Sequence, residues 1–187
     1  MSQLDIQLFY LINYFRNSIL DNILPIFSNP KFIDAFYILV SFFLLIKYSF
    51  KKYLVIFLFM ILGFLITDFS CAKIFKPYFK KERPFASIPK VYYYSDGKFE
   101  FLPQPKNKKN TLSFPSCHAG NSSFLSFFLS FFYSKLALIL YPFFILVGWS
   151  RIYLGVHFPF DVLGGWFLGL VLAFIFFKLC KKVLYKI

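Results

Sequence analysis

The chain has 187 residues and a formal net charge of +13, and 59% of its residues are hydrophobic. Soluble domains are about 45–50% apolar, so this composition excludes a soluble globular protein and indicates one membrane-embedded domain over residues 1–187. The basic residues cluster at the ends of apolar runs and in residues 73–109, all within a membrane context. This placement favours anionic lipid as the partner of the charge and argues against nucleic-acid binding.

The first 30 residues mix apolar and polar side chains. Leu4, Leu8 and Leu11 recur at helical spacing, but Gln7 and Arg16 interrupt the apolar face. One interpretation is an amphipathic helix at the membrane interface. The other is a short crossing paired with residues 21–28. No charged segment precedes an apolar run here, so we expect no removable signal peptide.

Five apolar stretches follow as candidates for bilayer-crossing helices, which need roughly 20 residues, and the short fourth one is expected to extend to about Arg151. They are residues 32–48, 53–70, 118–133, 136–149 and 159–178. Pro142 predicts a kink in the fourth. We therefore expect an all-α membrane bundle of about six helices, counting one short or interfacial helix at the N-terminus.

The order of the spans decides which loops share a face of the membrane. Residues 71–117 follow the second span, and the turn at residues 134–135 lies on the opposite face. Residues 76–118 and 150–161 must therefore lie on the same side. The opposite face carries lysines typical of the cytoplasm, but the long loop is basic as well, so the charge rule does not decide the orientation. Those lysines are Lys47, Lys51, Lys52, Lys135, Lys178, Lys181, Lys182 and Lys186.

Three basic residues and the start of the third span lie on this shared face. Lys76, Arg83 and Arg151 offer the positive charge and the guanidinium geometry that a tetrahedral oxyanion requires. Pro115 and Ser116 precede the third span, so free backbone N–H groups at its start point to the same anion. Three cations beside the histidines favour an anion site over a zinc site.

The two histidines of the chain lie on this face. His157 and Asp161 are four residues apart, so the carboxylate can hold one imidazole nitrogen and leave the other free as a nucleophile. His118 can then protonate the leaving group as a general acid.

In order and internal spacing, these residues resemble the type 2 phosphatidic acid phosphatase superfamily, the lipid phosphate phosphatases. The family's motifs read K-x6-R-P, P-S-G-H and S-R-x5-H-x3-D. This chain has Lys76-x6-Arg83-Pro84, Pro115-Ser116-Cys117-His118 and Ser150-Arg151-x5-His157-x3-Asp161. One position departs from the pattern, because Cys117 replaces glycine.

The resemblance implies a six-helix fold and a metal-independent phosphatase that needs no cofactor. It implies a phosphohistidine on His157, with Lys76, Arg83 and Arg151 holding the phosphate beside Ser116 and Cys117. It also implies a multi-pass protein of the bacterial inner membrane whose active site faces the periplasm, with the loop at residues 72–117 carrying the first two motifs. The partners implied are a phosphorylated lipid and the bilayer, with no obligate protein partner.

The three cysteines have unrelated spacings, so the sequence predicts neither a disulfide framework nor a zinc site. Cys117 lies at a helix start near three cations, and we expect a reactive thiolate there, unlike at Cys71 and Cys180. Asp68 is expected to pair with a nearby lysine outside the site.

The long loop contains Asp96-Gly97 between alternating residues, which predicts a β-hairpin. Tyrosines at residues 92–94 are typical of a membrane interface. We expect a flap here, acting as a lid or a headgroup site, with residues 106–110 either near anionic headgroups or simply solvated.

Bacterial relatives of this kind act on lipid A 1-phosphate, undecaprenyl pyrophosphate or phosphatidylglycerophosphate. Lipid A 1-phosphate is our preferred prediction. A small transporter subunit is the alternative from another class, but it would place charged residues at mid-membrane, where these spans have almost none.

Overall fold

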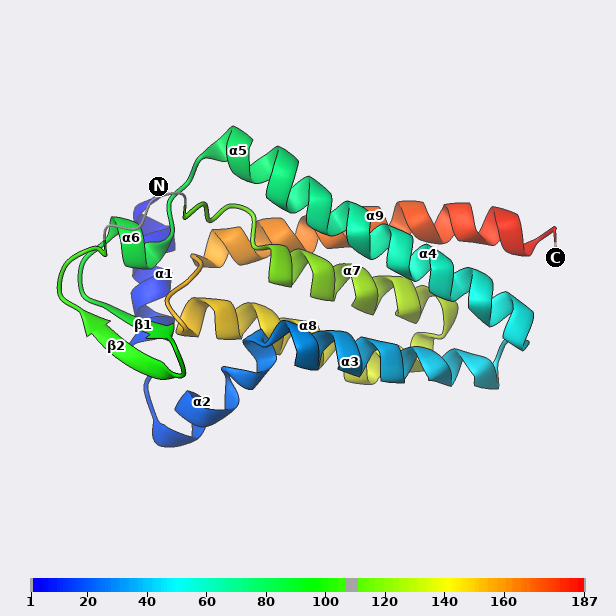
Figure 1. The fold of residues 1–187 in the computed structure, drawn as a ribbon, viewed down its shortest axis with the longest axis horizontal. Helices are drawn as coiled ribbons and strands as arrows, with labels where there is room; N and C mark the ends of the chain where they lie inside the picture. The colour runs from blue at the N-terminus through cyan, green and yellow to red at the C-terminus, as the bar shows by residue number, and fades with distance from the viewer. Residues whose placement is uncertain (1, 107–110, 187) are drawn as a thin grey trace.

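The computed structural model describes residues 2–106 and 111–186, which form a helical bundle with a small sheet at one end (Figure 1). In chain order the elements are α1 (Gln3–Asn13), α2 (Ser18–Ile23), η1 (Ile26–Ser28), α3 (Pro30–Ser41), η2 (Phe42–Ile46), α4 (Phe50–Phe69), the π-helical turn η3 (Ser70–Phe75), α5 (Lys76–Phe79), α6 (Pro84–Ser87), β1 (Val91–Ser95), β2 (Lys98–Leu102), α7 (Cys117–Phe132), η4 (Ser134–Leu136), α8 (Ala137–Tyr153) and α9 (Pro159–Leu184). The expectation of a helical membrane bundle is confirmed.

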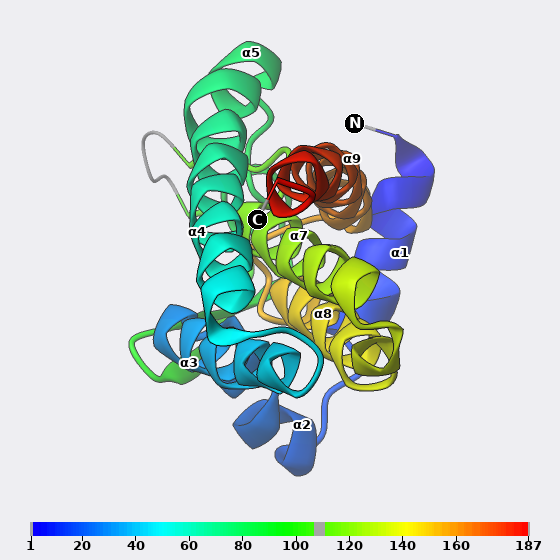
Figure 2. The ribbon, with the colours of Figure 1, turned by 90° about the vertical axis from the view of Figure 1, so that its right-hand side faces the viewer.

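Three helical stretches of the described chain are long and apolar enough to cross a bilayer: Phe50–Phe79, Ser134–Tyr153 and Pro159–Leu184. The segments Ser18–Ser28 and Pro30–Ile46 pass the same test together, with a bend of 69° between them. By this measure the described residues contain three or four crossing helices. The remaining long helix, α7, has 16 residues and lies among the others in Figure 2.

The second span is longer than the sequence predicts. The helix continues from α4 through η3 into α5, and the π-helical turn η3 directly precedes the first turn of α5, which contains Pro77. It ends at Lys80, whose backbone is left-handed with φ of 47°. Lys76 therefore lies on a helix, and the loop begins near residue 80 rather than 72.

The central helix, α7, is buried along most of its length. Three of its serine hydroxyls donate to backbone carbonyls, as when Ser126 donates to Leu140 O at 3.1 Å, whereas the buried Ser130 hydroxyl has no partner among the described residues. It packs closely on α9 because Gly169 lacks a side chain: a Cβ there would lie 2.0 Å from Ser123 Oγ. The outer surfaces of α4 and α9 instead expose large apolar side chains, as expected of lipid-facing helices, including Leu58, Leu62, Leu65, Phe167 and Phe174.

The N-terminal helix α1 runs across one end of the bundle instead of along it (Figure 1). This arrangement favours the interfacial interpretation for residues 3–13, whereas residues 18–28 belong to the bent pair. Asn13 connects α1 to two other elements, because its Nδ2 donates to Tyr92 O at 2.8 Å and to Tyr153 O at 2.9 Å.

The predicted hairpin is confirmed. Strands β1 and β2 pair antiparallel from Val91↔Leu102 to Ser95↔Lys98, and both turn residues, Asp96 and Gly97, have positive φ. Tyr94 N donates to Leu154 O at 3.1 Å, and Val91 is fully buried. These contacts fasten the hairpin to the bundle, so they lend no support to a mobile lid.

The tyrosines and lysines of this loop have mixed surroundings. Tyr93 is buried against Phe85, which differs from the expected position at the membrane interface. Lys106 pairs with Glu100 at 3.0 Å. Residues 107–110 lie outside the described residues, so the lipid-contact hypothesis for that segment stays a prediction.

Candidate active site

Three segments that are distant in the sequence meet at the end of the bundle that carries α1 and the hairpin. Lys81 Nζ lies 2.6 Å from Asp161 Oδ1, and Ser116 N donates to Asp161 O at 2.9 Å. At the other end, Lys47 Nζ donates to Phe132 O at 2.9 Å, beside the turn between α7 and α8. The expected common face of residues 76–118 and 150–161 is therefore present.

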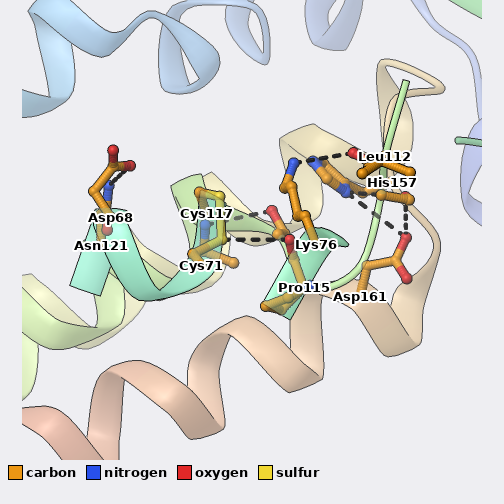
Figure 3. Close-up of a disulfide and its surroundings, with 12 residues drawn as sticks. Asp68, Cys71, Lys76, Leu112, Pro115, Cys117, Asn121, His157 and Asp161 are labelled. Carbon is orange, nitrogen blue, oxygen red and sulfur yellow. Dashed lines mark hydrogen bonds and ion pairs between the residues drawn. A yellow bond between two sulfur atoms is a disulfide. The ribbon is translucent and has the colours of Figure 1, made fainter. Parts of the chain in front are cut away.

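Three cations gather there without carboxylate partners. Lys76 Nζ donates to Leu112 O at 3.0 Å (Figure 3). Arg83 Nε donates to the same oxygen at 3.3 Å. Arg151 has a buried Nε atom with no hydrogen-bond partner among the described residues. No carboxylate oxygen in the described chain lies within ion-pair distance of any of the three. Partly buried cations with no carboxylate partner leave their charge uncompensated, so this cluster is suited to an anion from outside the chain.

The start of α7 faces the same region. Ser116 is the N-cap, and its fully buried side chain accepts from Ala119 N at a long 3.5 Å. Ser116 N is occupied by Asp161 O, which leaves the first-turn amides of Cys117 and His118 as the free donors of the helix. Free amides and the positive end of the helix dipole favour an anion.

His157 is buried between α8 and α9 and is tied to Arg151, whose carbonyl accepts from the backbone N of His157 at 3.2 Å. The expected hydrogen bond between His157 and Asp161 is absent, although the two side chains lie within ion-pair distance. Nδ1 of His157 lies 3.7 Å from Asp161 Oδ2, which is too long for a hydrogen bond. Ser113 lies between them, 3.3 Å from Nδ1, and donates to the same carboxylate oxygen.

Asp161 is fully buried, and it is held from several sides. Lys81 bridges it to Asp5 of α1, at 2.6 and 2.8 Å. Phe158 N donates to Asp161 Oδ2 at 2.8 Å, and Asp5 also accepts from Phe160 N at 2.9 Å. The N-terminal helix therefore helps to hold the loop that carries His157.

The sequence analysis missed Ser113, Lys81 and Asp5. Ser113 lies just ahead of the PSCH motif, so its proximity to the motif was a usable signal. Lys81 stands beside Lys80 in a basic run, and nothing in the run distinguishes the two. Asp5 is 156 residues from Asp161 in the sequence, and only the fold brings them together.

The surroundings of His157 keep its imidazole neutral. Burial lowers the pKa of His157 well below 6.5, and the nearby charges of Arg83, Arg151, Lys76 and Lys81 lower it further. A neutral imidazole retains the lone pair that a nucleophile needs.

His118 is at the start of α7, on the side that faces α3 and α4, where it lines a cavity with Asp68 and Asn121. Asn121 Nδ2 donates to Asp68 Oδ1 at 2.9 Å (Figure 3). The prediction that Asp68 pairs with a lysine is wrong, because no lysine of the described chain is paired with it.

Cys117 is joined to Cys71 by a disulfide, with 5.5 Å between the Cα atoms (Figure 3). The expectations of no disulfide and of a reactive thiolate at Cys117 are therefore both wrong. The spacing of 46 residues carried no signal, because the pair forms only when η3 packs beside the start of α7. Cys180 is free and buried.

Comparison with known proteins agrees with this arrangement. Residues 54–184 match the sequence model of the PAP2 superfamily. The chain is 28% identical over 177 residues to a lipid A 4′-phosphatase of Porphyromonas gingivalis, covering 91% of this chain and 70% of that protein. It is 38% identical over 66 residues to undecaprenyl-diphosphatase BcrC of Bacillus subtilis, covering 35% of this chain and 34% of the relative. The crystal structure of Aquifex aeolicus LpxE superposes with a TM-score of 0.68 at 25% identity, covering 95% of this chain and 96% of the other.

Proposed function

The chain belongs to the PAP2 superfamily of membrane lipid phosphatases, and from that premise we propose that it removes a phosphate from a lipid headgroup through a phosphohistidine on His157. The observation that carries the proposal is the group of three cations, Lys76, Arg83 and Arg151, that have no carboxylate partner in the described chain. They surround the buried, neutral His157, as its lowered pKa reflects. This combination binds a phosphate and presents a nucleophile to it.

In the first step, Nε2 of His157 attacks phosphorus as the bond to the leaving oxygen breaks. The leaving oxygen takes a proton from His118. Ser113 donates its hydroxyl proton to Asp161, so it accepts at His157, which places the imidazole proton on Nδ1 and leaves Nε2 free. Lys76, Arg83, Arg151 and the amides at the start of α7 stabilise the phosphoryl oxygens.

In the second step, water attacks the phosphohistidine and gives its proton to His118. The N–P bond breaks, phosphate leaves, and His157 returns to its neutral form. Each step transfers one proton through His118, and the chain's own cations balance the phosphoryl charge. We therefore propose that the reaction needs no metal.

For the substrate we propose a phosphate on lipid A. The support is the match along most of the chain to a lipid A 4′-phosphatase. The preference for the 1-phosphate stays a prediction from the sequence. Undecaprenyl diphosphate is the second candidate, because the shorter match to an undecaprenyl-diphosphatase falls at a higher identity.

For the orientation we propose a bacterial inner-membrane protein whose site faces the periplasm. The Cys71–Cys117 disulfide beside the site supports a periplasmic orientation, because disulfides persist in oxidising compartments such as the periplasm and are rare in the cytosol.

The test is release of inorganic phosphate by the purified protein from lipid A 1-phosphate, lipid A 4′-phosphate, undecaprenyl diphosphate and phosphatidylglycerophosphate, with EDTA present. We expect turnover of a lipid A phosphate and competitive inhibition by orthovanadate, which mimics the five-coordinate phosphorus. Phosphate release from none of the four lipids would refute the proposal. Loss of activity in EDTA with recovery on adding zinc would refute the metal-free mechanism alone.

A further inference from the structure

A separate cavity adjoins the candidate site where α3, α4 and α7 meet. Its volume is about 240 Å³, and its lining includes Asp34, Phe64, Asp68, His118 and Asn121. Lys76, Arg83 and Arg151 are not among the lining residues, so the cavity is distinct from the cationic cluster. His118 is the residue that both regions share.

The unpaired polar side-chain atoms of this lining, apart from His118, are hydrogen-bond acceptors. Asp34 has no hydrogen-bond or ion-pair partner among the described residues, and Asn121 Oδ1 is buried without a partner there. Asp68 uses Oδ1 to accept from Asn121, which leaves its Oδ2 open. Asp34 is exposed and Asp68 is half-buried, so water reaches both, whereas the buried Oδ1 of Asn121 has no partner among the described residues. A ligand that brings donors would satisfy all three groups at once.

The position of His118 identifies which part of a substrate reaches the cavity. In the proposed mechanism His118 protonates the leaving oxygen, so the group attached to that oxygen lies on the His118 side of the phosphate. We propose that this cavity binds the leaving group of the substrate and selects lipids whose leaving group carries hydroxyl or amino groups next to the phosphate. The inference rests on the proposed function and names its substrate class.

A neighbouring apolar groove lies next to this cavity and is suited to the acyl part of such a lipid. A second cavity of about 260 Å³ shares Asp34 and Phe64 with the first and continues between α3 and α4. Its remaining lining is almost entirely apolar: Tyr37, Ile38, Met60, Ile61, Leu65 and Leu125. The Tyr37 hydroxyl is already paired with Ser122 O and Ser126 Oγ, so it offers little to a polar ligand. We assign this groove to an acyl chain of the same substrate.

The carboxylates also act against one class of substrate. When a prenyl diphosphate is cleaved, the leaving group is itself a phosphate, and its charge would enter a cavity lined by Asp34 and Asp68. Like charges at short range in a poorly solvated site repel strongly. An amino sugar or a glycerol unit brings donors without that negative charge. The cavity therefore favours a lipid A phosphate over undecaprenyl diphosphate.

The test compares substrates that differ only in the leaving group. Lysophosphatidic acid and its 2-deoxy analogue with the same acyl chain differ only in the free hydroxyl next to the phosphate ester, and lipid A and undecaprenyl diphosphate extend the panel. We expect kcat/KM of the wild type to favour the hydroxyl-bearing member of the matched pair by about tenfold. Asp34→Asn and Asp68→Asn should each reduce that ratio by about fivefold or more and raise the relative rate on undecaprenyl diphosphate.

The design of the variants makes the comparison of kcat/KM ratios interpretable in two ways. Asp34→Asn is nearly isosteric and breaks no contact with the described residues, so the variant should fold. Asp96→Asn makes the same chemical change in the hairpin turn, away from both cavities, and should leave the ratio unchanged. Equal losses on every substrate in the Asp34 and Asp68 variants would overturn the inference, as would a wild type without the preference.

A binding measurement separates this inference from the proposed function. Thermal stabilisation of the detergent-purified protein by glucosamine 1-phosphate should exceed that by inorganic phosphate at equal concentration, and Asp34→Asn should abolish the excess. A protein that hydrolyses none of the lipids yet shows this excess would refute the phosphatase function and leave the donor-selective cavity standing. An active enzyme with neither the excess nor the kinetic preference would overturn the cavity and leave the function standing.

Discussion

His157 and Asp161 are connected through a third side chain. Their facing atoms, Nδ1 and Oδ2, are 3.7 Å apart, and the Ser113 hydroxyl contacts both. Because the hydroxyl donates to the carboxylate, it can only accept from the imidazole. Ser113 is thus positioned to set the tautomer of His157, a role that a carboxylate performs directly in the usual triad.

We expect Ser113→Ala to lower kcat by about 10- to 100-fold with little change in KM, because His157 loses the partner that orients it. Ser113→Thr keeps the hydroxyl and should recover most of the rate. The measurement is steady-state phosphate release, with thermal stability as the check on folding. Wild-type kcat in a folded Ser113→Ala enzyme would show that the relay is not needed.

His157 itself should be indispensable. His157→Ala should lose at least about 10³-fold in kcat/KM while the protein stays folded, because no other described side chain can form the covalent intermediate. A phosphorus-labelled substrate should leave an acid-labile label on the wild type, which mass spectrometry would assign to His157. His118→Ala is the informative comparison, since it should still accept the label from a substrate whose leaving group needs no proton. A label on another residue would contradict the mechanism.

The parts of the site that the sequence predicted are those with fixed local spacing. His157 and Asp161 are four residues apart, and Pro159 begins α9 as expected. The prediction of a direct hydrogen bond between them was wrong, because a spacing of four residues says nothing about a third side chain inserted from another segment. Ser113 comes from residues that precede α7, and Asp5 comes from the N-terminal helix. Contacts of this kind depend on the packing of distant segments.

Prediction of the fold from the sequence has the same limit. Apolar runs located the long helices, because a span is defined by its own composition. The end of the second span was placed too early, because η3 and Pro77 continue the helix past the polar residues after Ser70. The Asp96-Gly97 turn was predictable from two residues, whereas the attachment of the hairpin to Asn13 and Leu154 was not.

Lys81 gives a prediction about pH. The charge of Lys81 adds to the burial and the stronger cationic effects that lower the pKa of His157. The nucleophile must be neutral, so activity is present above that pKa and is lost as the pH falls through it. Lys81→Met removes a positive charge and leaves Asp161 less compensated, and both changes raise the pKa of His157. The acid limb of kcat/KM should therefore move to higher pH.

The matched control is Lys81→Arg, which keeps the charge and should keep the wild-type profile. The substrate phosphate titrates in the same way in the assays of all three proteins. A difference between their pH profiles of kcat/KM therefore comes from groups of the enzyme. An acid limb in Lys81→Met at or below the wild-type position would refute the electrostatic role.

Orientation can be tested by labelling from outside the cell. Single cysteines at Asp96, in the hairpin, and at Ser134, in the turn between α7 and α8, lie at opposite ends of the bundle (Figure 1). In intact spheroplasts an impermeant maleimide should reach position 96 and miss position 134. Permeabilised cells, in which both sites react, supply the control. The reverse pattern would place the site in the cytoplasm.

The last prediction concerns the disulfide, which ties two parts of the phosphate site together. Cys71 is in the π-helical turn five residues before Lys76, and Cys117 is between Ser116 and His118. Breaking the bond frees the start of α7 to move relative to the helix that carries Lys76. We expect Cys71→Ser to lower kcat/KM by about 10-fold, because misplaced binding groups stabilise the transition state less well. It should also lower thermal stability, since such bonds typically contribute about 2–4 kcal/mol.

Cys117→Ser should match Cys71→Ser, and the double variant should be no worse than either, because one bond is lost in all three. A dithiol reductant should impose the same loss on the wild type and none on the variants, with Cys180→Ser as the control for the buried free thiol. Iodoacetamide should leave the unreduced wild type active, since neither sulfur carries a thiol. Rapid alkylation of Cys117 without prior reduction would mean that the disulfide does not form, and would restore the reactive thiolate that the sequence alone suggested.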